Sequence, residues 1–457
     1  MSSRGVGPRA RGVALLVGAG AVGIAPACGL ALDGLGSPAP DASTGGVDAG
    51  GDVEPTEAGE GDDAATEADG PATGDGAAAS VTIASVGAIT QPTGVAQGTH
   101  LLYATHSARW WLFFIEDNQP YELQASSSPD FAIWTAATPL QLPASLDENG
   151  GNFSVAYADI AGVDVVHISL GLHFPDVDAG PDRRHFHARA SLSGGAILYD
   201  TPEQVTMVTD PALVEPDGPA TIVTADNRVW DSSGWANYMG TGNEVAWESE
   251  GFDLGTSWDG MLGLQQNIAA EAHTVNARTF AVAGGSLVAL WELADQEPDP
   301  TNVAWSQNGI LGWGMPANVF TANPQSANDW DVVEVSAKDL RVVRRSLDGS
   351  FDHLRYDGTT WTTLAAPPSD SWLAESGVVL LTDGTHVVVV TVAGDAASSV
   401  RTIEWDGSAW GAWSTLEGST AARRYLSAWS SPGHAAVVWT QLTPSLDLDI
   451  VGKLVPF

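Results

Sequence analysis

The sequence predicts an all-β protein, a β-propeller with seven blades or, as the alternative, six. From about residue 81 onward, short apolar runs alternate with turn residues, a pattern typical of antiparallel strands. Asp-Gly pairs separate several of these runs, and Asp-Gly is preferred in two-residue hairpins because such turns need a positive φ. A tryptophan follows these turns at regular intervals, and a period of about 40–60 residues in an all-β chain is typical of propeller blades.

Residues 1–27 have the features of a secretory signal peptide. Arg4, Arg9 and Arg11 precede an apolar run from Val13 to Ala25, which is shorter than the roughly 20 residues that a membrane-spanning helix needs. Small residues follow, and then Cys28, the one cysteine of the chain. This segment resembles a bacterial lipoprotein signal, which implies export and a lipid on Cys28.

The expected location is therefore the bacterial cell envelope, at the outer membrane or the cell surface. The family prefers Leu where Ala25 stands, so ordinary cleavage at the same bond without lipidation is the alternative. An unpaired thiol in an exported protein needs an explanation, which lipidation supplies.

Residues 28–80 are expected to form a disordered acidic linker. After Cys28 they contain twelve acidic residues and no Lys, Arg or aromatic residue. Such a segment buries too little apolar surface to offset its ordering entropy, and repulsion between its charges extends it. We interpret it as a spacer between the lipid and the domain formed by residues 81–457.

The charge of this domain excludes one large class of partners. Residues 81–457 carry 44 acidic residues and 15 Lys or Arg. Nucleic acid is excluded because its binding depends on neutralising phosphates with basic side chains. The membrane is expected to be contacted only through the lipid.

The blades are expected near residues 99–141, 152–205, 219–265, 278–318, 329–366 and 378–416. The remaining segment, 425–457, supplies three strands. A fourth strand from 81–89 would complete this last sheet and join the two ends of the chain, which removes the exposed edges.

The turns resemble the Asp-box, Ser-x-Asp-x-Gly-x-Thr-Trp, of sialidase-like propellers, and some also resemble propeller-lectin repeats. The best match is 251–258, a shortened copy lies at 128–134, and the copies at 357–361 and 406–410 read Asp-Gly-x-x-Trp. The resemblance implies structural turn roles for Asp130, Trp134, Asp253, Trp258, Asp357, Trp361, Asp406 and Trp410.

The same resemblance raises the question of catalysis. Sialidases use an arginine triad, a Tyr-Glu nucleophile pair, an acid Asp and an Arg-Ile-Pro signature. This chain lacks Arg-Ile-Pro, and no spacing of its arginines selects a triad, so no catalytic residue is assigned. The sequence favours a non-catalytic module that binds carbohydrate or protein. A divergent sialidase-like glycoside hydrolase is the alternative.

Candidate ligand contacts are few. Trp110, Trp111, Trp291 and Trp372 lie outside the turn position of the repeat, and any of them that is exposed would stack on a ligand. The insertion 173–187 contains Asp176, Asp178 and Asp182, oxygen donors of the kind that calcium prefers, although the full calcium-loop spacing is absent. His185 and His187 alternate in this stretch, as two ligands on one strand face would. No other cofactor is expected.

Overall fold

Short apolar runs between turn residues fold into strands throughout the part of the chain that the computed structural model describes. That part comprises residues 79–87, 99–116, 122–142, 145–146, 153–173, 183–200, 202–204, 330–336, 338–345, 349–369, 377–394, 398–418 and 421–457. It also includes the strand segments 214–223, 229–236, 247–252, 257–258, 273–282, 286–294, 302–308 and 317–318. Side chains are not described for these last segments or for 145–146, 173, 183–185 and 203–204.

The described strands form seven antiparallel sheets, which we number along the chain. Sheet 1 contains β2 (Leu101–Ala104), β3 (Arg109–Glu116), β4 (Glu122–Ser128) and β5 (Thr138–Leu140). Sheet 2 contains β6 (Ser145–Leu146), β7 (Phe153–Ile160), β8 (Val163–His173), β9 (Arg183–Ser193), β10 (Ala196–Tyr199) and β11 (Glu203–Gln204). Sheet 3 contains β12 (Val214–Val223), β13 (Val229–Ala236), β14 (Trp247–Phe252) and β15 (Ser257–Trp258).

Sheet 4 contains β16 (His273–Val282), β17 (Ser286–Ala294), β18 (Asn302–Asn308) and β19 (Ala317–Asn318). Sheet 5 contains β20 (Trp330–Ser336), β21 (Asp339–Arg345), β22 (Phe351–Tyr356) and β23 (Trp361–Thr363). Sheet 6 contains β24 (Val378–Thr382), β25 (Val387–Ala393), β26 (Ser399–Trp405) and β27 (Ser414–Glu417). Sheet 7 contains β28 (Arg423–Ser431), β29 (His434–Leu442), β30 (Leu448–Leu454) and β1 (Val81–Ser85).

Six of these sheets have the expected four strands, which follow sequence order in five of them, whereas in sheet 7 the first strand, β1, lies beside the last, β30. Sheet 2 differs, because β6 pairs with β8 and β11 pairs with β9, which brings its total to six. The outer strand of sheet 6, β27, is short. Trp410 makes only an isolated bridge to Trp405, and regular pairing begins at Ser414.

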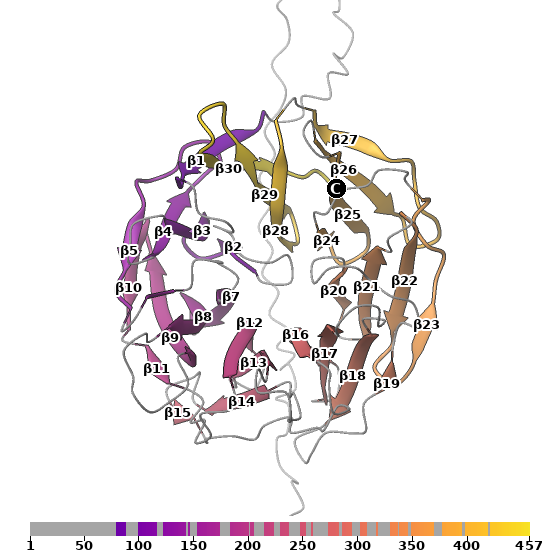
Figure 1. Ribbon diagram of the computed structural model, residues 1–457, viewed down its shortest axis with the longest axis horizontal. Helices are drawn as coiled ribbons and strands as arrows, with labels where there is room; N and C mark the ends of the chain where they lie inside the picture. The colour runs from indigo at the N-terminus through magenta and orange to yellow at the C-terminus, as the bar shows by residue number, and fades with distance from the viewer. Residues whose placement is uncertain are drawn as a thin grey trace, which may run out of the picture. The chain divides into compact units, whose positions relative to one another are not determined.

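The sheets are arranged as in a propeller (Figure 1), with β2, β7, β12, β16, β20, β24 and β28 at their inner ends. Neighbouring inner strands pack together in the pairs β2 with β7, β7 with β12, β12 with β16, β20 with β24, β24 with β28 and β28 with β2. At these six junctions, an inner strand of one sheet therefore rests on the inner strand of the next.

The two ends of the domain meet in sheet 7, as the sequence predicts. Val81 pairs with Gly452 and Ser85 with Asp449, so β1 covers the edge that β30 would otherwise expose. The pairing places the first and last strands of the domain side by side.

The apolar core lies between neighbouring sheets. One cluster joins sheets 7, 1 and 2, a second joins sheets 6 and 7, and a third joins sheets 5 and 6. Strand β25 is buried along its whole length, which explains why its sequence, Val-Val-Val-Val-Thr-Val-Ala, is apolar on both faces. Polar bonds support this packing: Asp331 of β20 accepts a hydrogen bond from the Leu380 N–H of β24 at 2.7 Å.

Candidate functional site

The Asp residues of the repeated turns act on the backbone of their own hairpins. Asp357 accepts hydrogen bonds from the backbone N–H groups of Thr359 and Thr360 at 2.9 and 2.8 Å. The Thr359 hydroxyl also donates to it at 2.7 Å, and this bond contributes most to holding the pKa of Asp357 below its usual range. Asp130 and Asp406 bond the N–H groups two and three residues ahead in the same way.

The tryptophans of these turns pack against neighbouring strands. The Trp410 indole N–H donates to the Ala365 carbonyl at 2.7 Å, and its ring meets the buried His353 edge-on, so it connects sheet 6 to sheet 5. Trp361 packs on Tyr356 of the preceding strand, with ring centroids 4.9 Å apart. Trp134 donates to the Phe131 carbonyl inside its own turn.

For several of the predicted residues, the structure describes only the backbone or does not describe the residue. Trp258 pairs with Gly251 in the β14–β15 hairpin, and Trp291 lies on β17; only their backbone course is described. The others lie outside the described residues: Cys28, Asp176, Asp178, Asp182, Asp253 and Trp372.

Two of the candidate ligand contacts, Trp110 and Trp111, are buried. Their side chains are 3% and 2% exposed. Both lie on β3, the second strand of sheet 1, which the neighbouring sheets cover on both faces, as the burial of six consecutive residues from Trp110 to Ile115 shows. Neither indole face is open to a ligand.

A partly exposed aromatic cluster lies above Trp110, where sheets 7 and 1 meet. Tyr103, at the end of β2, stacks on His434, the first residue of β29, with centroids 3.7 Å apart. Trp429 of β28 lies 6.3 Å from Tyr103 and 5.8 Å from Trp110. Trp429 and His434 are partly accessible to solvent.

A polar cluster adjoins it, where sheets 1 and 2 meet. The Asp164 carboxylate accepts hydrogen bonds from the backbone N–H groups of His106 and Ser107 at 3.0 and 2.6 Å. The Tyr157 hydroxyl donates to Asp164 at 2.8 Å and lies 2.5 Å from the Thr105 hydroxyl. These bonds fix the turn between β2 and β3 against sheet 2.

Beside this cluster stands an accessible His–Asp pair. His106 Nε2 lies 2.9 Å from Asp159 Oδ2, and the two side chains are 42% and 52% exposed. Their hydrogen bond raises the pKa of His106 and lowers that of Asp159. Burial alone would raise the pKa of Asp164, but its hydrogen bonds outweigh burial and lower it. Asp159 and Asp164 are therefore both carboxylates at neutral pH.

A second such pair lies in the corresponding turn of sheet 6. His386 Nδ1 is 2.8 Å from Asp383 Oδ2, and this bond raises the pKa of His386. Sheets 6 and 7 are joined near this turn, because the Thr382 N–H donates to the Ser430 hydroxyl at 2.8 Å. We call the surface formed by the turns at 105–108, 161–162, 383–386 and 432–433 the inner-turn face, since each turn follows an innermost strand.

The inner-turn face combines aromatic rings with carboxylates and imidazoles. Rings offer flat apolar surfaces, while the polar groups beside them accept and donate hydrogen bonds, a combination typical of binding sites for small polar molecules. Sequence reasoning missed these residues, because each belongs to a different repeat. The one available signal was a histidine at or next to three of the four turns.

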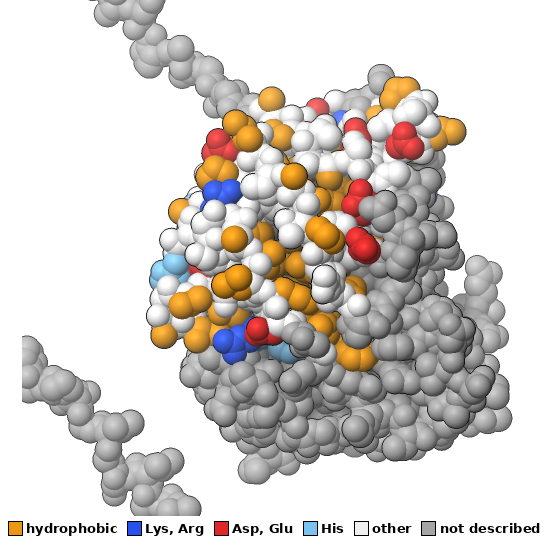
Figure 2. Space-filling model, turned by 90° about the vertical axis from the view of Figure 1, so that its left-hand side faces the viewer, with side chains coloured by type: hydrophobic (Ala, Val, Ile, Leu, Met, Phe, Trp, Pro, Cys, Tyr) orange, Lys and Arg blue, Asp and Glu red, His pale blue; other side chains and the backbone are white. Residues whose placement is uncertain are grey.

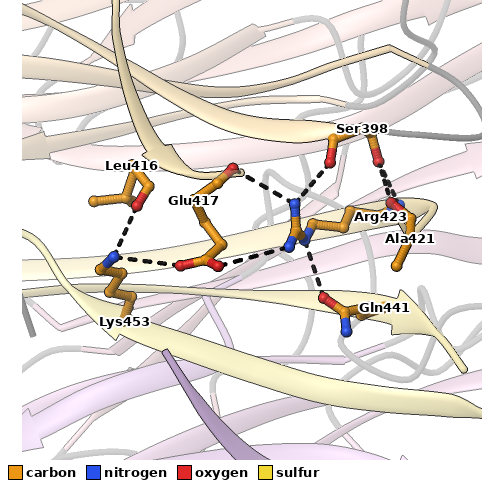
Figure 3. Close-up of polar contacts among 7 residues, drawn as sticks. All are labelled: Ser398, Leu416, Glu417, Ala421, Arg423, Gln441 and Lys453. Atoms are coloured by element: carbon orange, nitrogen blue, oxygen red, sulfur yellow. Dashed lines mark hydrogen bonds and ion pairs between the residues drawn. The ribbon is translucent and has the colours of Figure 1, made fainter. Parts of the chain in front are cut away.

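A buried ionic network lies between sheets 6 and 7 (Figure 3). The Arg423 side chain, 2% exposed, donates to the Ser398 carbonyl at 2.7 Å and to Gln441 Oε1 at 3.1 Å. Glu417 lies between Arg423 and Lys453, at 3.9 and 3.3 Å. Because these donors are occupied by protein groups of sheets 6 and 7, we interpret the network as a structural link between them.

The outer side of sheets 1 and 2 shows scattered hydrophobic side chains (Figure 2). Ile133 and Leu198 of these sheets are 74% and 68% exposed. Singly exposed apolar residues are ordinary on protein surfaces, so this side indicates no binding site. The described part of the chain also contains no helix with the length and apolar character needed to cross a bilayer.

Comparisons with known proteins support the fold. No family model and no curated protein matches the chain. Among solved structures, the BP39L lectin from Burkholderia pseudomallei is similar over 78% of this chain and 96% of its own, with 11% identity and a TM-score of 0.56.

Two further structures match less closely. The Hadza microbial sialidase Hz136 matches over 74% of this chain and 73% of its own, with 11% identity and a TM-score of 0.45. The six-bladed lectin of Aleuria aurantia matches over 67% and 95%, with 11% identity and a TM-score of 0.40. The similarity to BP39L shows that the domain shares the fold of that structure, and the sheet topology agrees with a propeller arrangement.

Proposed function

We propose that this chain binds carbohydrate through the inner-turn face and does not cleave its ligand. The observation that carries the proposal is the presence, on that face, of the partly exposed Trp429 and His434 together with the exposed Asp159 carboxylate. Aromatic faces stack on the apolar faces of sugar rings, and carboxylates accept hydrogen bonds from sugar hydroxyls. The similarity in fold to a bacterial lectin supports the same ligand class.

A glycan array tests this proposal, with the chain from residue 29 onward as the probe. We expect binding to a subset of glycans, weakened at least tenfold by Trp429→Ala. Trp413→Ala is the matched control, because Trp413 is also a partly exposed tryptophan but donates to the Pro368 carbonyl at the boundary between sheets 5 and 6. Equal weakening by both variants, or an empty array, contradicts the proposal and favours a protein ligand.

The same preparation separates binding from catalysis. Incubation with a panel of fluorogenic glycosides is expected to release no fluorophore above the level of a heat-denatured sample. Reproducible hydrolysis of any glycoside would replace the binding proposal with a glycoside hydrolase.

We also propose that export and a lipid on Cys28 hold the domain at the bacterial cell envelope, with residues 29–80 as the spacer. The basic segment, the short apolar run and the one cysteine of the chain support this. Mass spectrometry of the mature N-terminus is expected to find a diacylated or triacylated Cys28. An unmodified Cys28 or an uncleaved first segment contradicts it.

For the architecture we propose seven blades, one for each sheet. The seven sheets and the pairing of β1 with β30 support this number over six. Averaged electron-microscopy views along the propeller axis are expected to show seven lobes, and six would overturn the count.

A further inference from the structure

Two arginines lie opposite each other on neighbouring strands of sheet 5. Arg341 of β21 pairs directly with Arg355 of β22, so their side chains occupy the same face of the sheet. Val343, two residues after Arg341, shares this face and belongs to the apolar core between sheets 5 and 6. The two guanidinium groups therefore lie on the side of sheet 5 that faces sheet 6.

This pair lies near the turn at 383–386 of the inner-turn face. Strand β21 begins at Asp339, two residues before Arg341, so the pair is close to the end of sheet 5 that carries the β20–β21 connection. The Val335 carbonyl oxygen, near the same connection, lies 3.8 Å from the position that a Cβ on Gly384 would occupy. This end of sheet 5 therefore lies beside the turn of sheet 6.

One carboxylate serves both arginines. Asp339 accepts hydrogen bonds from Nε and Nη2 of Arg341, the second at 2.9 Å. Its Oδ2 also lies 3.2 Å from Nε of Arg355. Like charges on directly paired residues repel each other, and one carboxylate offsets only one of the two guanidinium charges. The three side chains therefore retain one uncompensated positive charge.

Hydrogen-bond donors remain unused as well. Arg341 is 9% exposed, and its Nη1 is buried without a hydrogen-bond partner among the described residues. The Arg355 side chain is 43% exposed, and Asp339 is its one ion-pair partner in the described part of the chain. A buried donor without an acceptor is costly, and the cost is higher for a charged group. The pair thus combines a buried cation that lacks an acceptor with an accessible one.

Arg423 offers a comparison, because it is also buried and also shares its carboxylate. Its partner Glu417 lies close to a second cation, Lys453. However, a backbone carbonyl and a side-chain amide oxygen accept two further hydrogen bonds from Arg423. Arg341 has no such acceptors within the described residues, which indicates that its cluster is incomplete without a ligand.

The described neighbours along these strands do not supply the missing negative charge. Lys338, which precedes Asp339, is exposed and adds a positive charge. Burial lowers the pKa of His353, two residues before Arg355, to about 4, so this imidazole is neutral at physiological pH. The Asp357 carboxylate, two residues after Arg355, accepts hydrogen bonds from backbone and hydroxyl groups of its own turn.

We propose that Arg341 and Arg355 bind the carboxylate or sulfate group of a small anionic ligand between sheets 5 and 6. The planar guanidinium fork matches the paired oxygens of such groups, and charge-assisted hydrogen bonds of this kind are strong. Arg355 contacts the ligand from the solvent side, and Arg341 contributes the uncompensated charge beneath it. The acidic excess of the domain disfavours long polyanions, so the ligand presents a single anionic group.

Calorimetric titration of the purified chain in low-salt buffer tests the proposal with three probes: sodium sulfate, sodium glucuronate and glucose. We expect one site per chain for sulfate, glucuronate or both, and weaker binding as sodium chloride is added, because salt screens the charge. Binding of sulfate alone identifies a free oxyanion as the ligand, whereas binding of glucuronate alone identifies a sugar acid. Competition by glucose, which has no anionic group, or absence of binding by both anions would overturn the proposal.

Variants locate the site. Arg355→Ala is expected to weaken anion binding at least tenfold, and Arg355→Lys, which keeps the charge but loses the fork, to weaken it less. Arg424→Ala, which removes an exposed arginine of sheet 7, is expected to leave anion binding unchanged. The same holds for Trp429→Ala, which disables the proposed carbohydrate site, so the two sites can fail independently. Full affinity in Arg355→Ala, or equal weakening by Arg424→Ala or Trp429→Ala, would overturn the proposal.

Discussion

Phe131 shows how one residue can be strained and still stabilise the fold. It follows Asp130 at φ +65°, where the other Asp turns have Gly358, Gly384 and Gly407 at +91° to +95°. A side chain in this region costs about 1–2 kcal/mol. Its buried ring contacts Trp110 and Trp134, each at 5.2 Å between centroids, and this packing offsets the strain.

At most positions an Ala variant is more stable than a Gly variant. At position 131 we expect the opposite order of stability. Phe131→Ala loses the ring and keeps the strain, whereas Phe131→Gly loses the ring and relieves it. We expect Phe131→Gly to have the higher free energy of unfolding, by about 1 kcal/mol, in urea titration. The exposed Ile133 serves as the control position, where Ile133→Ala is expected to be at least as stable as Ile133→Gly. If the free energy of unfolding of Phe131→Ala equals or exceeds that of Phe131→Gly, the backbone at residue 131 is not strained.

The His106–Asp159 pair predicts a defined pH dependence. The raised pKa of His106 means that the pair stabilises the fold fully below the unfolded value of 6.5 and ceases to do so as pH rises through the folded pKa. The lowered pKa of Asp159 means that its contribution is lost as pH falls through its folded value. The pair therefore stabilises most in mildly acidic solution.

An NMR titration of the His106 imidazole checks this dependence. We expect a midpoint above 6.5 that moves down in Asp159→Asn. Asp447→Asn, which removes an exposed carboxylate of the β29–β30 loop, is expected to leave the midpoint unchanged. A His106 midpoint at or below 6.5 in the unmodified chain would show that the pair is not formed in solution.

At the scale of elements, polar side chains hold neighbouring sheets together where apolar packing ends. Arg423 opens β28 and bonds groups of both sheet 6 and sheet 7 (Figure 3). Its charge is buried, so removing it leaves Glu417 with one cation fewer and the Ser398 carbonyl without this donor.

Arg423→Ala is accordingly expected to lower the free energy of unfolding by about 3–5 kcal/mol. The neighbouring Arg424 is exposed, and Arg424→Ala is expected to change it by less than about 0.5 kcal/mol. Chemical denaturation of the three proteins measures both effects. Comparable losses in the two variants would show that the network is not a specific link.

At the scale of the whole molecule, β1 is the element that removes the last exposed strand edge of sheet 7. A chain starting at residue 79 keeps β1, whereas one starting at residue 87 exposes the whole edge of β30. We expect the shorter chain to unfold at a lower temperature and to aggregate, because an open edge pairs with other chains. Light scattering during thermal unfolding distinguishes the two. Identical behaviour would mean that β1 contributes nothing to closure.

The sequence predicted the architecture well, because hairpins are local. The Asp-Gly turns, the position of each sheet and the return of β1 to β30 follow from residues that lie close together or from the need to cover an edge. The extra strands β6 and β11 were missed, since two-residue pairings leave no pattern in the sequence.

The candidate site could not be predicted from the sequence, because its residues are far apart along the chain. Tyr103 and His434 stack although 331 positions separate them, and no periodicity connects residues of different sheets. The error at Trp110 and Trp111 has the same origin. Trp110 and Trp111 lie outside the turn position of the repeat, but this position does not determine whether a side chain is buried. Their burial depends on the neighbouring sheets, which are formed by distant parts of the sequence.

The pairing of β1 with β30 also constrains how the chain can be made. Sheet 7 combines β1 with β28, β29 and β30, so it can be completed only after β30 has been synthesised. Until then β1 has no partner, and contacts of such large sequence separation form slowly. A domain built in this order stays incomplete while it is being synthesised, the state in which a polypeptide can still be threaded through a narrow pore.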